Sequence, residues 1–141
     1  MKENHLEDAC LAWLADLGWS CVQGDAVSPG SQPETRARYS DVVLVPRLRA
    51  AIERLNPALS LAEIDEAVTK VAMYGAQSVV DANQEIYDWL RNGVPVERIE
   101  ADGRRTVLRV RTIDLAGPND LLAVRQFTIH GQKIRRPDIV L

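Results

Sequence analysis

The sequence predicts a mixed α/β domain in which helices flank a small sheet. The chain has 141 residues, a length that suits a single domain over residues 1–141. Apolar residues recur at helical spacing in much of the segment before Val94, and from Val94 onward the pattern alternates as it does in strands. Helices followed by a run of strands are the order expected when helices pack beside a small sheet.

The opening helix is predicted by a capping box and an apolar stripe. Asn4 followed by Glu7 fits a capping box, in which each side chain satisfies a backbone N–H at a helix start. Gly18 then ends the helix in the left-handed conformation that glycine favours. Residues 19–22 follow as a short strand. Helical spacing joins the apolar residues of this helix, which are Leu6, Ala9, Cys10, Trp13, Leu14 and Leu17.

The next segment predicts a loop, a strand and a helix. Residues 24–38 are rich in glycine, serine and proline and have no period, as expected of a loop. Tyr39–Val45 is an apolar run that predicts a strand closed by Pro46. Residues 47–55 have helical spacing, and this helix stops at Asn56 because a residue before proline disfavours helical geometry.

Two further helices precede the change of period. Ser60 and Glu63 form a second capping box. The helix that follows them is expected to bury Leu61, Ile64, Val68, Val71 and Ala72. The third helix runs from Val79 to Arg91 and stops at Asn92–Gly93. Its inward side chains are expected to be Val79, Val80, Ile86, Tyr87 and Leu90.

The last third of the chain predicts a β-meander. Thr106–Asp114 alternates, and a turn at residues 117–120 leads to a second strand over Leu121–His130. Gly131–Gln132 forms the next turn, and Pro137–Leu141 begins a third strand. A domain rarely ends on an open apolar strand, so we expect the sequence to be a fragment of a longer protein.

Charge is distributed unevenly along the chain. Residues 1–100 carry 9 Lys/Arg and 16 Asp/Glu, whereas residues 101–141 carry 8 and 4. The basic segment fits either a phosphate-facing side or a solvated strand face. The candidates for sequence-independent phosphate contact are Arg109, Arg111, Arg125, Lys133, Arg135 and Arg136.

Several functional classes lack their motifs. The chain has no phosphate loop, no G-x-G-x-x-G and no G-x-S-x-G, so nothing predicts an ATPase, a dinucleotide enzyme or a serine hydrolase. His5 and His130 lie too far apart in sequence to predict a zinc site with the two cysteines. No apolar run approaches the ~20 residues of a membrane helix. We therefore expect a soluble cytoplasmic protein without membrane contact.

Acidic residues at the ends of elements are the remaining candidates for chemistry. Asp138 opens an apolar strand, where a carboxylate is costly unless it is paired, lies at the sheet edge or binds a cation. Mg²⁺ favours such oxygen ligands and supports phosphodiester hydrolysis. The alternative is a strand-entry aspartate in a turn, and Asp41 shows a similar pattern. Capping explains Glu7 fully, but Glu7 can also turn toward a metal if its helix packs beside the sheet.

Several stretches, taken in order, resemble the N-terminal region of the restriction subunit of type I restriction–modification enzymes. Arg136–Leu141 resembles the first catalytic motif of that family. The other matching stretches are Glu3–Glu7, Leu14, Leu17 and Gly18–Trp19, Ser40–Leu44, Arg47–Leu48, Ala51–Ile52, Leu55–Leu59, Asn83–Glu85, Leu90–Val94, Asn119–Leu122 and Val124–Phe127.

The resemblance implies a restriction-endonuclease-like PD-(D/E)xK core with a Mg²⁺ site on a sheet between helices. Asp138 would be the first metal-binding carboxylate, and Glu7 an additional acidic ligand. It also implies double-stranded DNA and the modification and specificity subunits as partners, with ATP used only by motor domains outside this segment.

The family pattern continues through an E-x-K strand, and no E-x-K follows Asp138 here. We therefore expect this chain alone to be unable to cut DNA efficiently. The alternative is a catalytically silent DNA-binding or subunit-interaction module of the same ancestry.

Overall fold

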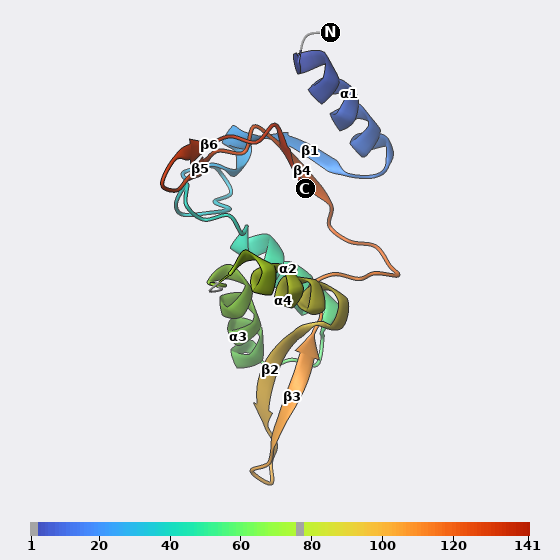
Figure 1. The fold of residues 1–141 in the computed structure, drawn as a ribbon. Coiled ribbons are helices and arrows are strands. Elements are labelled where there is room, and N and C mark those ends of the chain that lie inside the picture. The colour runs from blue at the N-terminus through green and yellow to red at the C-terminus, as the bar shows by residue number, and fades with distance from the viewer. Residues whose placement is uncertain (1–2, 76–77) are drawn as a thin grey trace. The chain divides into compact units, whose positions relative to one another are not determined.

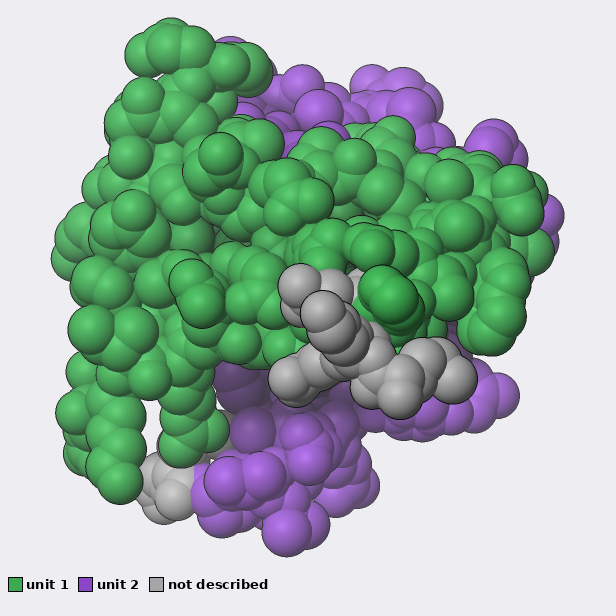
Figure 2. Space-filling view, turned by 90° about the horizontal axis from the view of Figure 1, so that it is seen from above, with its two compact units in different colours: residues 1–44, 120–141 green, residues 45–119 purple. Residues whose placement is uncertain are grey.

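In the computed structural model, residues 3–75 and 78–141 are described. The chain divides into two compact units, one formed by residues 1–44 and 120–141 and the other by residues 45–119 (Figure 2). Both contain helices and strands, which confirms the predicted mixed α/β class. The prediction of a single domain over residues 1–141 stays a prediction. None of the helices in the described ranges is long and apolar enough to cross a membrane.

The first unit is built around a three-stranded sheet (Figure 1). Its elements are α1 (Glu3–Asp16), β1 (Ser20–Gln23), the 3₁₀ helix η1 (Gly24–Val27), β4 (Leu122–Arg125), β5 (Ile129–His130), β6 (Ile134–Arg135) and β7 (Ile139–Val140). Strand β4 lies in the centre, parallel to β1 and antiparallel to β7. Strands β5 and β6 form a separate antiparallel hairpin. Val27, Val124 and Phe127 form a small apolar core, and Val22, Leu122 and Val140 of the three sheet strands pack against it.

The second unit places three helices beside a hairpin (Figure 1). Its elements are α2 (Val45–Leu55), α3 (Leu61–Ala72), α4 (Val79–Asn92), β2 (Val94–Ile99) and β3 (Arg105–Val110). Strands β2 and β3 pair antiparallel, with Val94 opposite Val110. The helix and hairpin side chains form the larger core of the protein, which is Ile52, Ile64, Ala67, Val68, Trp89, Val94, Val96 and Val110.

The first helix forms at the predicted place, but part of its apolar stripe is not buried. The backbone of Asn4 lies within α1, and its side chain, on which the predicted capping box depends, is outside the described part of the structure. Gly18 adopts the expected positive φ of 90°. On the apolar stripe, Leu6, Trp13 and Leu17 are exposed. Helical periodicity therefore identified the helix correctly, while the side that packs is set by the contacts of Glu7 described below.

The predicted strand at Tyr39–Val45 does not form. Residues 28–44 are irregular, and Val45 is already the first residue of α2. Pro46 is compatible with a first helical turn because that turn needs no N–H donor from it. The irregular backbone is held by Arg36, whose guanidinium donates to the carbonyls of Val27 at 2.8 Å and Asp41 at 3.2 Å. Side-chain bonds thus take the place of a strand ladder here.

The second capping box is confirmed in full. The Ser60 hydroxyl accepts from the Glu63 N–H, and the Glu63 carboxylate accepts from the Ser60 N–H at 2.7 Å. In the buried stripe of α3, Ile64 and Val68 are buried as predicted, whereas Leu61 is exposed. Helix α4 has the predicted extent, and Ile86 packs against the core as predicted. The other predicted inward side chains, Val79, Val80, Tyr87 and Leu90, are exposed, and Trp89 is buried in their place.

The predicted strands form in shorter pieces. Strand β3 ends at Val110, so it covers only the first part of Thr106–Asp114. The long strand expected over Leu121–His130 is interrupted at Gln126, which has a positive φ of 58°. A left-handed residue cannot continue a strand, and the chain resumes as β5 after this break. Strand β7 confirms the strand predicted after Pro137.

Candidate active site

Three side chains meet at one end of strand β4 in the first unit. Gln126 follows the last residue of β4, Asp138 precedes the first residue of β7, and Glu7 lies on α1. Sheet pairing brings the first two together, because Arg125 lies opposite Ile139 in the antiparallel β4–β7 pair. Helix α1 contacts both β1 and β4, which places Glu7 beside them.

The side-chain amide of Gln126 joins the two predicted carboxylates. Its Nε2 donates to Glu7 Oε2 at 3.3 Å and to Glu7 Oε1 at 3.4 Å. The same Nε2 lies 3.4 Å from Asp138 Oδ1, to which it also donates. The structure therefore brings together Glu7 and Asp138, which lie at opposite ends of the sequence, around one NH₂ group.

The backbone fixes this arrangement as well. The N–H of Gln126 donates to the carbonyl oxygen of Asp138 at 2.9 Å, which ties the start of β7 to the end of β4. Gly24 lies against the same turn: a Cβ atom on it would stand 2.2 Å from the carbonyl oxygen of Gln126. Only a residue without a side chain allows the backbone of Gln126 to approach this closely.

Arg125 neutralises part of the acidic charge at this place. Its Nε donates to Glu7 Oε2 at 2.7 Å, and its Nη1 donates to Asp8 Oδ1 at 2.7 Å. The side chains of Arg125 and Glu7 are only 18% and 8% exposed. The hydrogen bond that Arg125 donates to Glu7, together with the one it donates to Asp8, raises the pKa of Arg125 against the effect of burial. Glu7 thus forms a tertiary ion pair with a strand residue.

Acidic side chains outnumber basic ones in the hydrogen-bonded group at this end of β4. Arg125 supplies one positive charge against the carboxylates of Glu7, Asp8 and Asp138. Glu7 and Asp138 both lie within hydrogen-bond distance of the Gln126 amide, and carboxylate oxygens are the ligand type that Mg²⁺ takes, one or two together with several waters. Within the described ranges, no group of three or more His, Cys, Asp or Glu residues is arranged to hold a metal.

The competing acidic candidate, Asp41, has a local explanation. Its carboxylate accepts from the backbone N–H of Arg38 and from the Arg38 guanidinium, both at 3.0 Å. These bonds close a turn within the irregular segment before α2. The similar sequence patterns at Asp41 and Asp138 therefore end in different environments.

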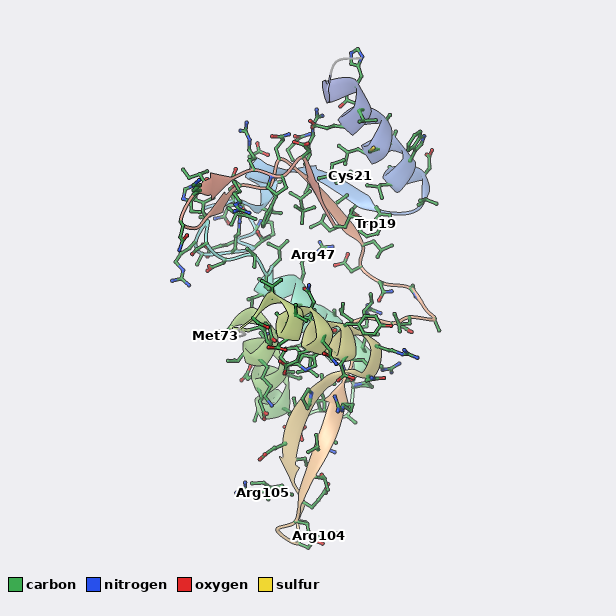
Figure 3. The ribbon with its side chains drawn as sticks, in the orientation of Figure 1. Trp19, Cys21, Arg47, Met73, Arg104 and Arg105 are labelled. Atoms are coloured by element: carbon green, nitrogen blue, oxygen red, sulfur yellow. The ribbon has the colours of Figure 1, made fainter. Side chains whose placement is uncertain are left out.

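The predicted phosphate-binding residues fall into both units. In the second unit, Arg109 bonds Asp88 at 3.1 Å and Arg111 bonds the carbonyl of Leu55 at 3.1 Å. In the first unit, Arg125 bonds Glu7 and Asp8, as described above. Arg104 and Arg105 lie near the tip of the β2–β3 hairpin (Figure 3).

Three basic residues of the first unit remain exposed. Lys133, Arg135 and Arg136 lie on or beside the β5–β6 hairpin, and all three are exposed. Lys133 and Arg135 line a shallow hollow together with Ile129, Gly131 and Gln132. The β5–β6 hairpin therefore carries exposed positive charge in the first unit.

Sequence reasoning gave no role to Gln126, Gly24 or Asp8. The resemblance included Gln126, but an isolated glutamine after a strand has no motif that indicates its contacts. Its positive φ and the bare backbone of Gly24 depend on a tertiary contact between segments about 100 residues apart, a separation over which periodicity carries no signal.

Comparisons with known proteins assign the chain to a family. The family model described as "Type I restriction enzyme R protein N terminus (HSDR_N)" matches residues 1–141. The chain belongs to this family. It is also 33% identical over 144 residues to the type I restriction enzyme HindI endonuclease subunit of Haemophilus influenzae. The alignment covers 99% of the chain and 14% of that relative.

The R protein family match covers both compact units and all the residues discussed above. No solved structure gives a significant match. The comparisons thus confirm the family predicted from the sequence, and the PD-(D/E)xK core stays a prediction.

Proposed function

We propose that this chain is the N-terminal part of a type I restriction endonuclease subunit and contributes to Mg²⁺-dependent cleavage of double-stranded DNA. The observation that carries the proposal is the convergence of Glu7 and Asp138 on the Gln126 amide. Family membership supports it, because the relative from Haemophilus influenzae is named an endonuclease subunit.

In this proposal Asp138 and Glu7 hold the metal. A bound Mg²⁺ would polarise a phosphate oxygen and lower the pKa of an attacking water. Arg125 orients the Glu7 carboxylate by their 2.7 Å bond. Gln126 holds the distance between the two acids. The E-x-K pair of the family pattern, ATP-driven translocation, and contacts with modification and specificity subunits belong to the longer subunit.

The β5–β6 hairpin is proposed to contact the DNA backbone. Lys133, Arg135 and Arg136 are exposed and present positive charge without a base-reading motif. Contacts of this kind are independent of sequence and weaken as salt rises, because phosphate neutralisation releases counterions. Arg109, Arg111 and Arg125 make intramolecular bonds, so their contribution to DNA binding requires exchange of those partners.

The metal site is tested by binding of Mn²⁺, used as a spectroscopic substitute for Mg²⁺. We expect the chain to bind Mn²⁺, and Asp138→Asn and Glu7→Gln each to weaken binding at least about tenfold, since each removes a charged oxygen ligand. Asp16→Asn is the matched control, because Asp16 is an exposed acid on the same helix as Glu7. Equal Mn²⁺ affinity in all four proteins would refute the proposed metal site.

A catalytically silent DNA-binding or interaction module is the second candidate. The bonds from Arg125 to Glu7 and Asp8 favour it, since they give Glu7 a complete structural role without any metal. The Mn²⁺ experiment separates the two candidates. A chain that binds duplex DNA in a salt-dependent way, but binds no Mn²⁺, supports the silent module.

A further inference from the structure

Gln126 combines an unusual backbone conformation with a central position between two acids. Residues other than glycine rarely adopt a positive φ, and asparagine, aspartate and histidine are the usual exceptions. Glutamine gains no known local stabilisation there, yet Gln126 has a φ of 58°. This conformation turns the chain out of β4 and directs the side chain toward Glu7 and Asp138.

Three contacts hold the conformation. The N–H of Gln126 is bonded to the Asp138 carbonyl at 2.9 Å. The carbonyl of Gln126 faces Gly24, where a Cβ atom would stand only 2.2 Å away. The neighbouring Phe127 is buried in the small core with Val27 and Val124. The backbone on both sides of the Gln126 side chain is therefore fixed, and its amide is held in place by the fold.

The amide itself makes long hydrogen bonds of 3.3–3.4 Å to the two acids. Bonds of this length lie just beyond the ordinary N–H···O range of about 2.7–3.2 Å, so each is weak. In contrast, Arg125 binds Glu7 at 2.7 Å. Glu7 is therefore held firmly by Arg125, while the Gln126 amide links it to Asp138.

We propose that Gln126 is a positioning residue that holds Glu7 and Asp138 at the separation needed to share one divalent cation, with Gly24 as the residue that admits its backbone. The inference rests on the proposed function of this site. Residues that orient metal ligands through hydrogen bonds commonly change metal affinity 10- to 100-fold when they are replaced.

The principal variant is Gln126→Gly. Glycine adopts positive φ without strain, so the backbone is kept while the amide is removed. We expect the thermal unfolding midpoint to stay within about 4 °C of the wild type and the Mn²⁺ affinity to fall about 10- to 100-fold. Gln132→Gly is the matched control, because Gln132 lies in the exposed turn of the β5–β6 hairpin of the same unit. Its Mn²⁺ affinity should equal that of the wild type.

Two further variants keep the test decisive if Gln126→Gly does not fold. Gln126→Asn retains an amide and suits positive φ, but its side chain is one methylene shorter and cannot reach both acids. Gly24→Ala leaves the Gln126 side chain intact and displaces its backbone through the 2.2 Å contact. Both are expected to weaken Mn²⁺ binding. Wild-type affinity in folded Gln126→Gly, or in folded Gln126→Asn together with Gly24→Ala, overturns the positioning role.

A metal-free measurement separates failure of this inference from failure of the proposed function. In isotope-labelled protein, the side-chain NH₂ signals of Gln126 report its contacts by nuclear magnetic resonance. Asp138→Asn and Glu7→Gln should each shift these signals, and Asp16→Asn should not. If the wild type binds no Mn²⁺ but the signals shift as expected, the metal site is refuted and the bridging geometry stands. Signals that neither variant moves refute the bridge itself.

Discussion

Each of the two units contains a glutamate on a helix that binds an arginine on a strand. The two glutamates differ in the number of short hydrogen bonds that they accept. In the second unit, Glu63 of α3 accepts from Arg98 of β2 at 2.6 and 3.0 Å and from the N–H of Ser60 at 2.7 Å. In the first unit, Glu7 of α1 accepts from Arg125 of β4 at 2.7 Å, and its remaining bonds are the long ones from Gln126.

The difference is that Glu63 accepts short hydrogen bonds on both oxygens, whereas Glu7 accepts only one short bond. Both oxygens of Glu63 are occupied by short, charged or backbone donors of its own unit, and these bonds lower its pKa to about 2. Glu7 shares its weaker donor with a second carboxylate, Asp138. A capping-box pattern occurs at both sequence positions, and the structure shows the complete box at Ser60 and Glu63. The capping-box pattern in the sequence therefore identifies Glu63 as a structural residue. Glu7 is identified as a candidate metal ligand only by its tertiary contacts.

The largest effect is expected from Glu63→Ala. It removes the half of the capping box that Glu63 supplies to the Ser60 N–H and leaves Arg98 without its charged partner, which should lower the free energy of unfolding by about 3 kcal/mol. Urea denaturation measures this change. Glu66→Ala is the control, because Glu66 forms a more exposed i,i+4 pair with Lys70 on the same helix and should cost about 0.5 kcal/mol or less. Equal losses of unfolding free energy in Glu63→Ala and Glu66→Ala would show that Glu63 stabilises the fold no more than an exposed acid of the same helix.

Acid titration sharpens the same contrast. The pKa of Glu63 falls from 4.5 to about 2 on folding, first because of the Arg98 hydrogen bond. A lowered pKa stabilises the fold above the unfolded-state value, and this contribution is lost as the pH falls from about 4.5 toward 2. We expect the difference in unfolding free energy between wild type and Glu63→Gln to shrink over that window. A difference independent of pH contradicts this assignment.

A smaller loss is expected from Arg125→Met, which keeps the length of the side chain and removes its charge. Glu7 is nearly buried and would lose its strongest donor, so we expect the unfolding free energy to fall by about 1–3 kcal/mol. Chemical denaturation followed by circular dichroism gives the value. Asp8→Asn serves as the control, since the side chain of Asp8 is 60% exposed and its bond to Arg125 is a surface contact.

The smallest effect is expected at the tip of the β2–β3 hairpin. Arg104 bonds Asp102 at 2.6 Å, but both side chains are largely exposed. Exposed pairs contribute about 0–1 kcal/mol, so Arg104→Gln should leave the thermal midpoint within about 4 °C of the wild type. A larger shift would mean that this exposed pair behaves like the two helix–strand pairs.

The sequence predicted the positions of the helices better than it predicted which face of each helix is buried. Strong helical spacing located α1, α2, α3 and α4, and the Ser60–Glu63 pair located a true cap. Exposure of Trp13 and Tyr87 and burial of Trp89 were not predictable, because an apolar stripe does not show which side has a partner. The strand expected at Tyr39–Val45 failed for a similar reason: an apolar run pairs only if a neighbouring strand is available.

For the candidate site, the sequence supplied the two acids but not what joins them. Asp138 was found from a carboxylate at a strand entry, and Glu7 from its alternative role on the first helix. The positive φ of Gln126, the close approach of Gly24 and the ion pair of Arg125 arise from contacts between the two ends of the chain. Such contacts lie outside the reach of spacing rules, which act over one or two helical turns.

The position of β7 at the rim of its sheet has one more consequence. Among the described residues, β7 is hydrogen-bonded to β4 on one side only, so its other edge carries backbone donors and acceptors that a further strand can pair with. Asp138 stands at the first residue before this strand. A strand added at that edge brings its own side chains next to the carboxylate without rearranging β1 or β4. A further strand can thus add side chains next to Asp138, while the strands that position Glu7 and Gln126 keep their places.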